Sequence, residues 1–342
     1  MANLLDIRRR IRSVINTRQI TRAMKMVSAA RLRRAQDRAL AARPYAQMLT
    51  NVLKSLVSRA EIYDPETGEP RHPLLAVRPE QNILLILVSG DRGLAGAFNS
   101  NIFRAALKFL ESKEGKSVEI EAVGRKGRDF VKRRYAAGDG ANGVRLIGEL
   151  VGILGRLDHS QAAELSRKVI DRYTRGEIDA VYLLFNEFKS VISQRLVVER
   201  ILPIGEIGKP EEALAEGQTL EERQRALEAA RGTGVSVRPA DTRAIDEKAE
   251  KFATANVDYI YEQSPQEMFN GLLPKYVAVQ IFRAMLESIA AEHAARMTAM
   301  DAATNNATDM IDALTLAMNR VRQAKITKEI IEIVSGAAAA GG

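Results

Sequence analysis

The 342-residue sequence contains no cysteine and no tryptophan, and aromatic residues make up only 5% of it. Without cysteine the chain can form no disulfide, thiol nucleophile, cysteine-ligated zinc site or thiol redox switch. The scarcity of aromatic residues favours long helices over an all-β fold. Long apolar runs are also missing, since the longest strictly apolar stretch, Ile83–Val88, is far shorter than the ~20 residues that cross a bilayer.

Glycine is absent from residues 1–60 and from residues 276–335, and proline occurs once within these two segments, at Pro44. At about 1.5 Å per residue the segments predict helices of roughly 55 and 60 residues, about 80 and 90 Å long. The second helix begins upstream, because Ser264–Glu267 has the form of a capping box with proline in the first turn. We expect a local bend at Pro44 and either a bend or a second start at Pro274.

Both segments repeat apolar or small residues at alternating spacings of three and four, which is a heptad seam. The C-terminal seam runs through Leu286, Ala290, His293, Met297, Met300, Thr304, Ala307, Ile311, Leu314, Met318 and Val321. The N-terminal seam follows Leu4, Ile7, Ile11 and Val14 and, after a phase shift, Leu32, Ala35, Ala39, Ala42, Ala46, Leu49, Leu53 and Leu56. Helices of this length need partners of equal length. The sequence therefore predicts an antiparallel coiled coil between residues 1–60 and residues 264–340.

Residues 80–205 alternate apolar runs with amphipathic segments. Strands are predicted at 83–88, 118–123, 180–188 and 191–204, and helices at 100–112, 127–135 and 160–175. Continuous apolar strands followed by helices indicate a mostly parallel sheet covered on both faces. Lys189 and Ser190 join the last two strands as an antiparallel hairpin, and residues 138–143 form a plain loop. The predicted fold class is α/β, with a long antiparallel coiled coil of the N- and C-terminal helices beside the sheet domain.

A glycine-rich turn, Ser89–Gly96, follows the first strand and leads into a helix, as a phosphate-binding loop does. Its spacing matches neither G-x-G-x-x-G nor G-x-x-x-x-G-K-[ST], and no acidic residue stands where a ribose needs one. Its glycines, and those that follow the second strand, fit a tight turn and close helix packing. We therefore expect no nucleotide here and no cofactor in the chain.

Residues 206–252 form an inserted surface segment, because they contain several glycines and prolines and no aromatic residue before Phe252. Within this segment a capping box at Thr219–Glu222 and a stop at Gly232 predict one short helix.

Positive charge is concentrated in residues 1–43, which hold twelve Arg or Lys residues against two Asp. This segment has a net charge of +10 and the whole chain has +8, so the remainder is slightly acidic, at −2. A basic helix binds phosphates, anionic membranes or acidic protein surfaces. One class of function is therefore a basic coiled-coil nucleic-acid-binding protein. The lack of interleaved aromatic residues and of a groove-reading module favours an acidic protein partner instead.

No catalytic constellation is visible in the sequence. The three histidines, His72, His159 and His293, have no metal-ligand spacing. There is no Ser-His-Asp motif, Walker loop or pair of carboxylates in an apolar frame. This pattern favours a non-catalytic mechanical or interaction subunit over a cofactor-dependent α/β enzyme.

Both ends of the chain resemble the gamma subunit of F-type ATP synthases, the central rotor shaft. The resemblance rests on Ile326–Ala339 at the C-terminus and on Asp6–Arg8, Ile20–Val27 and Arg43–Tyr45 at the N-terminus. It implies that the sheet domain is Rossmann-like but binds no cofactor. It covers nearly the whole chain except the inserted segment, which falls where photosynthetic relatives carry a regulatory segment with a cysteine pair that this chain lacks.

The resemblance also implies a role and partners. A gamma subunit is a non-catalytic part of the proton-translocating ATP synthase, with one copy per complex, peripheral to the cytoplasmic face of the bacterial inner membrane. Its coiled coil enters a hexamer of alpha and beta subunits, and the epsilon subunit and the c-subunit ring hold its foot. By motif, the residues that couple rotation to catalysis or contact partners are Met24, Arg31, Arg33, Arg34, Arg296, Gln323, Thr327 and Glu329.

Overall fold

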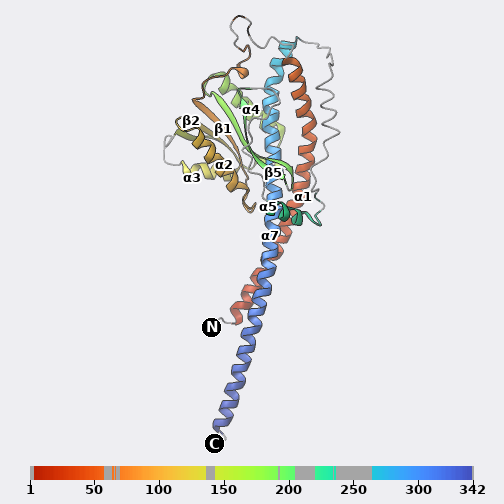
Figure 1. Ribbon diagram of the computed structural model, residues 1–342, viewed down its shortest axis with the longest axis vertical. Coiled ribbons are helices and arrows are strands. Elements are labelled where there is room, and N and C mark those ends of the chain that lie inside the picture. The colour runs from red at the N-terminus through yellow and green to blue at the C-terminus, as the bar shows by residue number, and fades with distance from the viewer. Residues whose placement is uncertain are drawn as a thin grey trace.

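Two long helices form a shaft, and a sheet domain packs against one end of it (Figure 1). The computed structural model describes residues 4–57, 64, 66, 70–135, 143–191, 193–204, 220–233, 235 and 264–340. The loop predicted at 138–143 lies outside this part of the chain except for its last residue. The same holds for most of the segment 206–252, in which the described residues include helix α5 (Leu220–Ala230).

The shaft consists of helix α1 (Leu4–Val57) and helix α7 (Pro265–Ala340), which are 54 and 76 residues long. They run antiparallel, with both chain termini toward the end remote from the sheet domain (Figure 1). Across their interface Lys25 Nζ lies 2.6 Å from Asp301 Oδ1, and the hydroxyls of Thr21 and Thr304 lie 2.7 Å apart. Helix α7 extends past the N-terminal end of α1, so its last turns form a single helix.

The predicted heptad seam is the contact surface of the shaft. Every seam residue named above is buried or half-buried, and Leu32, Leu53 and Met297 are completely buried. The phase shift in the N-terminal seam falls where buried Thr21 and Ser28 take the place of apolar residues. The predicted antiparallel coiled coil is confirmed.

The sheet has five strands in the order β3-β2-β1-β4-β5. The first four, β1 (Asn82–Val88), β2 (Ser117–Val123), β3 (Val144–Leu150) and β4 (Ala180–Ser190), pair in parallel, and β5 (Ser193–Leu202) pairs with β4 as an antiparallel hairpin. Strand β1 is central, and six of its seven residues are buried. The predicted α/β class is correct, but the sequence prediction missed the edge strand β3.

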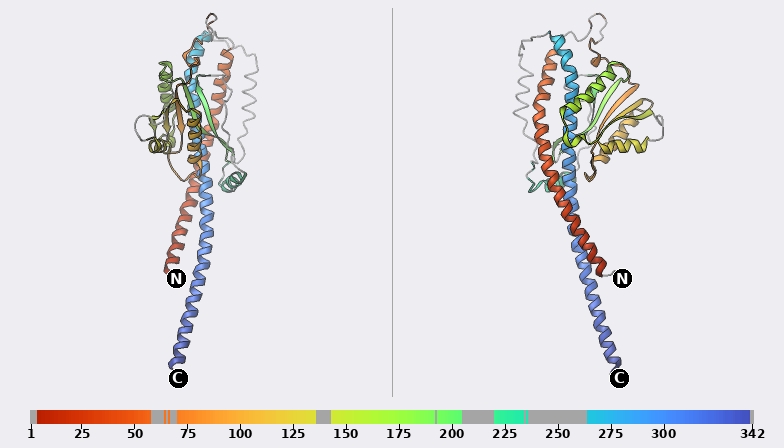
Figure 2. Two further views of the ribbon diagram at one scale, coloured as in Figure 1. Left: turned by 60° about the vertical axis from the view of Figure 1, so that its left-hand side comes forward. Right: turned by 180° about the vertical axis from the view of Figure 1, so that it is seen from behind.

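Helices cover both faces of the sheet (Figure 2). Helix α2 (Phe98–Ser112) and helix α3 (Arg125–Arg134) lie on one face, because two successive right-handed crossovers lead from β1 toward β3. The crossover to β4 runs in the other direction and places helix α4 (His159–Thr174) on the opposite face, together with the start of α7. Two short 3₁₀ helices, η1 (Pro73–Leu75) and η3 (Ile153–Arg156), complete the domain. The shaft thus forms part of the covering of the sheet.

Candidate functional site

The shaft and the sheet domain meet at the turn that follows β1, and Arg296 of α7 joins them. This arginine is buried, with 7% of its surface exposed. Its Nε and Nη2 both donate to the carbonyl oxygen of Gly93, each at 3.3 Å. The same guanidinium pairs with Glu292, one turn earlier on α7, and its Nη1 lies 3.3 Å from Nδ1 of His293. Arg296 therefore bonds to acceptors on both sides of the junction.

Burial shifts the pKa of both side chains beside Arg296. Burial raises the pKa of Glu292, although its ion pair and hydrogen bond with Arg296 oppose that shift. Burial also lowers the pKa of His293 to about 4, and the cations Arg296 and Arg31 lower it further. His293 is therefore neutral at pH 7, and its Nδ1 accepts a hydrogen bond from Arg296 in the matching tautomer.

A side chain of the glycine-rich turn Ser89–Gly96, that of Asp91, bonds to the two neighbouring loops. Oδ1 of Asp91 accepts hydrogen bonds from the backbone N–H of Arg125, the first residue of α3, and from that of Gly152, both at 3.0 Å. The N-terminus of such a helix is where a nucleotide-binding loop holds phosphate. In this chain the Asp91 carboxylate takes that place and ties together the loops after β1, β2 and β3.

The glycines near this turn serve packing and backbone geometry. Gly124, which precedes α3, has φ of +101°, and a Cβ there would lie 2.2 Å from the carbonyl oxygen of Ser89. Within the turn, Leu94 and Gly96 have positive φ, at 62° and 55°. A Cβ at Gly93 would have its nearest neighbour at 3.9 Å, so that position tolerates a side chain.

We expect Gly124→Ala to lower the free energy of unfolding by about 2–3 kcal/mol, because alanine is strained at positive φ and its methyl group displaces the Ser89 carbonyl. Gly93→Ala is the matched control, and its change should stay within about 0.5 kcal/mol, since the site has space. Urea unfolding of the two variants tests this. Equal destabilisation by both would contradict the assignment of the close approach to Gly124.

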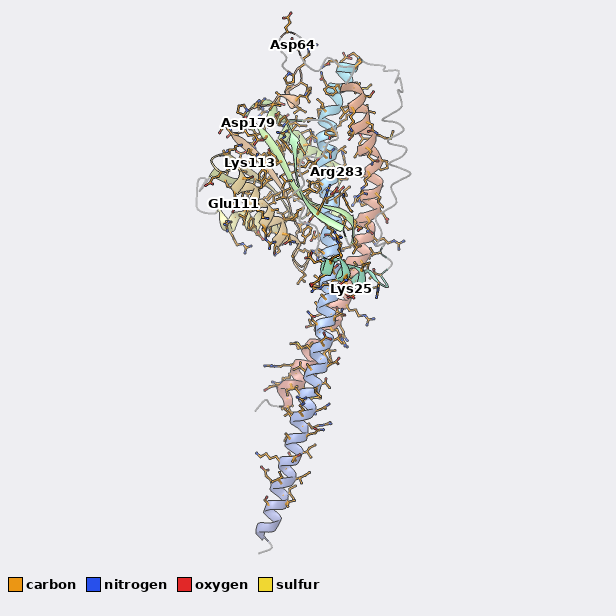
Figure 3. All side chains as sticks on the ribbon, viewed as in Figure 1. Lys25, Asp64, Glu111, Lys113, Asp179 and Arg283 are labelled. Carbon is orange, nitrogen blue, oxygen red and sulfur yellow. The ribbon has the colours of Figure 1, made fainter. Side chains whose placement is uncertain are left out.

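The candidate residues of α1 lie on the outside of the shaft. Met24 is half-buried beside Lys25, which Figure 3 shows close to α5. Arg31, Arg33 and Arg34 are exposed. These three arginines lie at the level of the sheet domain, and their exposed side chains are accessible to a partner protein.

The remaining candidates, Gln323, Thr327 and Glu329, lie on the part of α7 that extends beyond α1, and all three are exposed. Glu329 pairs with Lys325, one turn earlier on α7, at 3.7 Å. The structure does not gather the eight candidates into one site. It distributes them over the junction, the surface of α1 and the single-helix end of α7.

Sequence reasoning missed two members of the junction. Ser89 accepts the N–H of Gly127 at 2.7 Å, and Glu292 is the buried partner of Arg296. The spacing of Glu292 and Arg296, four residues apart on a helix, is a local signal for their pairing. No local signal shows that both are buried.

Among the described residues, no group of three or more His, Asp or Glu side chains is arranged to hold a metal ion. Within the same part of the chain, no helix combines the length and the apolar character that a membrane span requires.

Comparisons with known proteins identify the family. A family model described as ATP synthase matches residues 3–340. The ATP synthase gamma chain of Solibacter usitatus (strain Ellin6076) is 48% identical over 99% of this chain and 100% of its own length. That of Geobacter metallireducens (strain ATCC 53774 / DSM 7210 / GS-15) is 43% identical over 98% of both chains. Both matches extend across the region of the segment 206–252.

Solved structures show the same fold. One is the central stalk and c-ring of the Tetrahymena thermophila mitochondrial ATP synthase, where the match has 22% identity and a TM-score of 0.54 and covers 83% of this chain and 99% of that one. Another is the OSCP/F1/c-ring of the Euglena gracilis mitochondrial ATP synthase, with 17% identity, a TM-score of 0.55 and coverage of 98% and 94%. Together with the full-length relatives, which carry the assignment, these findings show that the chain belongs to the family of ATP synthase gamma chains, the central stalk of the enzyme.

Proposed function

We propose that this chain is a non-catalytic rotor shaft that couples proton flow to ATP synthesis, at the cytoplasmic face of a bacterial inner membrane. Its partners are the alpha and beta subunits of the catalytic hexamer, the epsilon subunit and the c-subunit ring, with one copy of the shaft per complex. The similar solved structures, which are of a central stalk with its c-ring and of an OSCP/F1/c-ring assembly, support this set of partners. The family assignment decides against the alternative of a nucleic-acid-binding protein.

The observation that carries the proposal is the uncovered end of α7. Beyond its contact with α1, this helix exposes large apolar side chains, namely Ile326 (48%), Ile330 (55%), Ile331 (59%), Ile333 (71%) and Val334 (62%). Contiguous exposed apolar surface marks an interaction site. These apolar side chains form no polar bonds with a surrounding surface, so the single helix can turn inside an apolar sleeve formed by the hexamer.

The one-sided shape of the molecule supports the rotor role. The sheet domain lies on one side of the shaft, and Arg296 fastens the two together through Gly93. Rotation of an asymmetric shaft presents a different surface to each catalytic subunit in turn. A junction of this kind transmits torque only if the two bodies do not slip. Arg296 is therefore a coupling residue that acts within the chain.

The hydrogen-bonding groups near the glycine-rich turn already have partners within the chain, which supports a non-catalytic role. The N-terminal N–H of α3 is already bonded to Asp91, and the guanidinium of Arg296 is bonded to Gly93 and Glu292. Neither group is free to bind a phosphate. We place catalysis on the partner subunits. The exposed residues Arg31, Arg33 and Arg34 contact acidic loops of those subunits.

The test is to reconstitute the complex in membrane vesicles and to measure ATP hydrolysis and ATP-driven proton pumping together. We expect Met24→Lys to lower the protons pumped per ATP at normal subunit stoichiometry. The new cation forms a charge-assisted bond with a carboxylate of the stator, and each step of rotation has to break that bond. Met48→Lys is the matched control, because Met48 is an exposed methionine of the same helix, at 54%, away from Met24. Its pumping ratio should equal that of the wild type.

Equal pumping ratios for the two lysine variants would remove Met24 from the coupling residues. ATP hydrolysis by the chain without its partner subunits would contradict the non-catalytic role.

A further inference from the structure

A hollow of about 650 Å³ lies where the end of α5 meets the shaft. Helix α1 contributes Arg18, Arg22 and Lys25 to its lining, and Arg231 follows the last residue of α5. Asp301 of α7 is the one acidic residue of the lining. We call this site the basic hollow. Figure 3 shows Lys25 beside α5 at this level of the shaft.

The described residues do not balance the charges of the basic hollow. Lys25 and Asp301 neutralise each other through their ion pair at 2.6 Å. In the described part of the chain, no carboxylate forms an ion pair with Arg18, Arg22 or Arg231. Three guanidinium groups therefore face one cavity, and none of them has a counter-charge among the described residues.

The positions of these arginines make the imbalance unfavourable for the chain alone. Arg18 and Arg22 are four residues apart on α1, and like charges at this spacing destabilise a helix. Arg231 brings a third positive charge from a different element. Such a cluster is stable when an anion occupies the space between its members.

Helix α5 is held to the shaft by small side chains. Its buried residues are Ala226, Ala229 and Ala230, and it packs on α7. Alanine buries little apolar surface, so this contact contributes little free energy. The helix ends at Ala230, and Gly232, whose φ is +71°, turns the chain just after Arg231, which lines the hollow. An anion held by Arg231 and by α1 together adds a second attachment.

We propose that the basic hollow binds a phosphate-bearing anion that bridges Arg18 and Arg22 of α1 to Arg231 and fastens α5 to the shaft. The planar guanidinium group binds phosphate oxygens through two parallel hydrogen bonds, which makes arginine the suited residue. The lining contains no aromatic side chain, so recognition is directed at phosphate and not at a nucleotide base. This site is separate from the glycine-rich turn and does not depend on the proposed rotor function.

The test is calorimetric titration of the full-length chain with diphosphate at constant ionic strength. We expect saturable binding that weakens about tenfold or more both in Arg18→Gln/Arg22→Gln and in Arg231→Gln, because each removes charge-assisted bonds. Arg12→Gln is the matched control, since Arg12 is an exposed arginine of α1 that does not line the hollow. Its affinity should equal that of the wild type. All substituted side chains lie on the surface or at the rim, and circular dichroism checks that the variants fold.

A second readout follows α5 itself. In the wild type, diphosphate should slow amide hydrogen exchange in residues 220–230, and in Arg231→Gln it should not. A parallel titration with ADP distinguishes the source of the phosphate: similar affinities for ADP and diphosphate support recognition of phosphate alone, whereas far tighter binding of ADP would overturn it.

Two results would overturn the site as a whole. One is the absence of saturable diphosphate binding to the wild-type chain. The other is an equal loss of affinity in Arg12→Gln and Arg231→Gln, which would assign the binding to the diffuse positive potential of α1.

Discussion

Replacing Arg296 with alanine is expected to lower the free energy of unfolding by about 3–5 kcal/mol, because the change leaves a buried carboxylate without its cation. Glu292 is 6% exposed, and Arg296 is its partner on α7. The variant also loses the two hydrogen bonds to the Gly93 carbonyl that hold the sheet domain to the shaft. Equilibrium unfolding in urea measures the loss.

The contrast with an exposed arginine makes this test specific. Arg33→Ala on α1 removes an exposed cation, and its effect should stay within about 0.5 kcal/mol. The double variant Glu292→Met/Arg296→Met should recover part of the loss, since apolar residues of similar volume replace a buried ion pair at little cost. If Arg296→Ala is as stable as Arg33→Ala, the guanidinium does not hold the junction.

The long helices of the shaft were predictable because their signal is local. A seam that repeats every three or four residues requires no knowledge of the rest of the fold. The sequence left two alternatives at Pro274, a bend or a second helix start, and the structure excludes the second start, since α7 runs through this proline. Leu273 and Val277, on either side of this proline, are completely buried. Tertiary packing of these residues outweighs the loss of one backbone donor.

Strand β3 was missed because its pattern is weak. Its alternate residues Val144, Leu146, Gly148 and Leu150 are the buried or half-buried ones, so a period of two is present. Gly148 interrupts the apolar series, and the Glu121 carboxylate fills the space where its side chain would be. An edge strand with one glycine carries too little apolar content for periodicity to identify it.

The sequence identified Arg296 as a candidate residue, but it did not reveal the groups that Arg296 binds. The seam places His293 and Met297 in the interface and leaves Arg296 on its flank, where an arginine is normally exposed. The carbonyl that binds it belongs to Gly93, 203 residues earlier in the chain. Burial by a distant loop has no local signal, so motif resemblance alone pointed to this residue.

A second large effect is expected at Glu287, a buried carboxyl group of α7 that faces the β4–β5 hairpin. Glu287 is 5% exposed, and its Oε2 has no hydrogen-bond partner among the described residues. Burial raises its pKa from 4.5 to about 7; Arg283 and Arg43 act against the shift, and Glu187 and Glu199 add to it. These groups lie on α7, α1, β4 and β5, which are the elements packed around it. Figure 3 labels Arg283 at this level of the shaft.

Because the pKa of Glu287 is higher in the folded chain than in the unfolded one, ionisation opposes folding. The carboxyl group costs nothing below about pH 4.5, where both states are protonated, and the cost grows until the pH passes about 7. A difference of 2.5 units corresponds to about 3 kcal/mol. Glu287→Gln cannot ionise, so it should be more stable than the wild type by about 3 kcal/mol at pH 8 and by less than about 1 kcal/mol at pH 5.

The matched comparison is Glu199→Gln. Glu199 pairs with Arg283 at 2.7 Å, so removal of its charge leaves that cation without its nearest carboxylate and should destabilise the chain at pH 8. The two glutamine variants thus change stability in opposite directions, although the substitution is the same and the sites are neighbours. Urea unfolding of both variants and the wild type at pH 5, 6, 7 and 8 checks this. Curves for Glu287→Gln and the wild type that stay parallel over this range would show that Glu287 is ionised in the folded chain at every pH, with its charge compensated by Arg283 and Arg43.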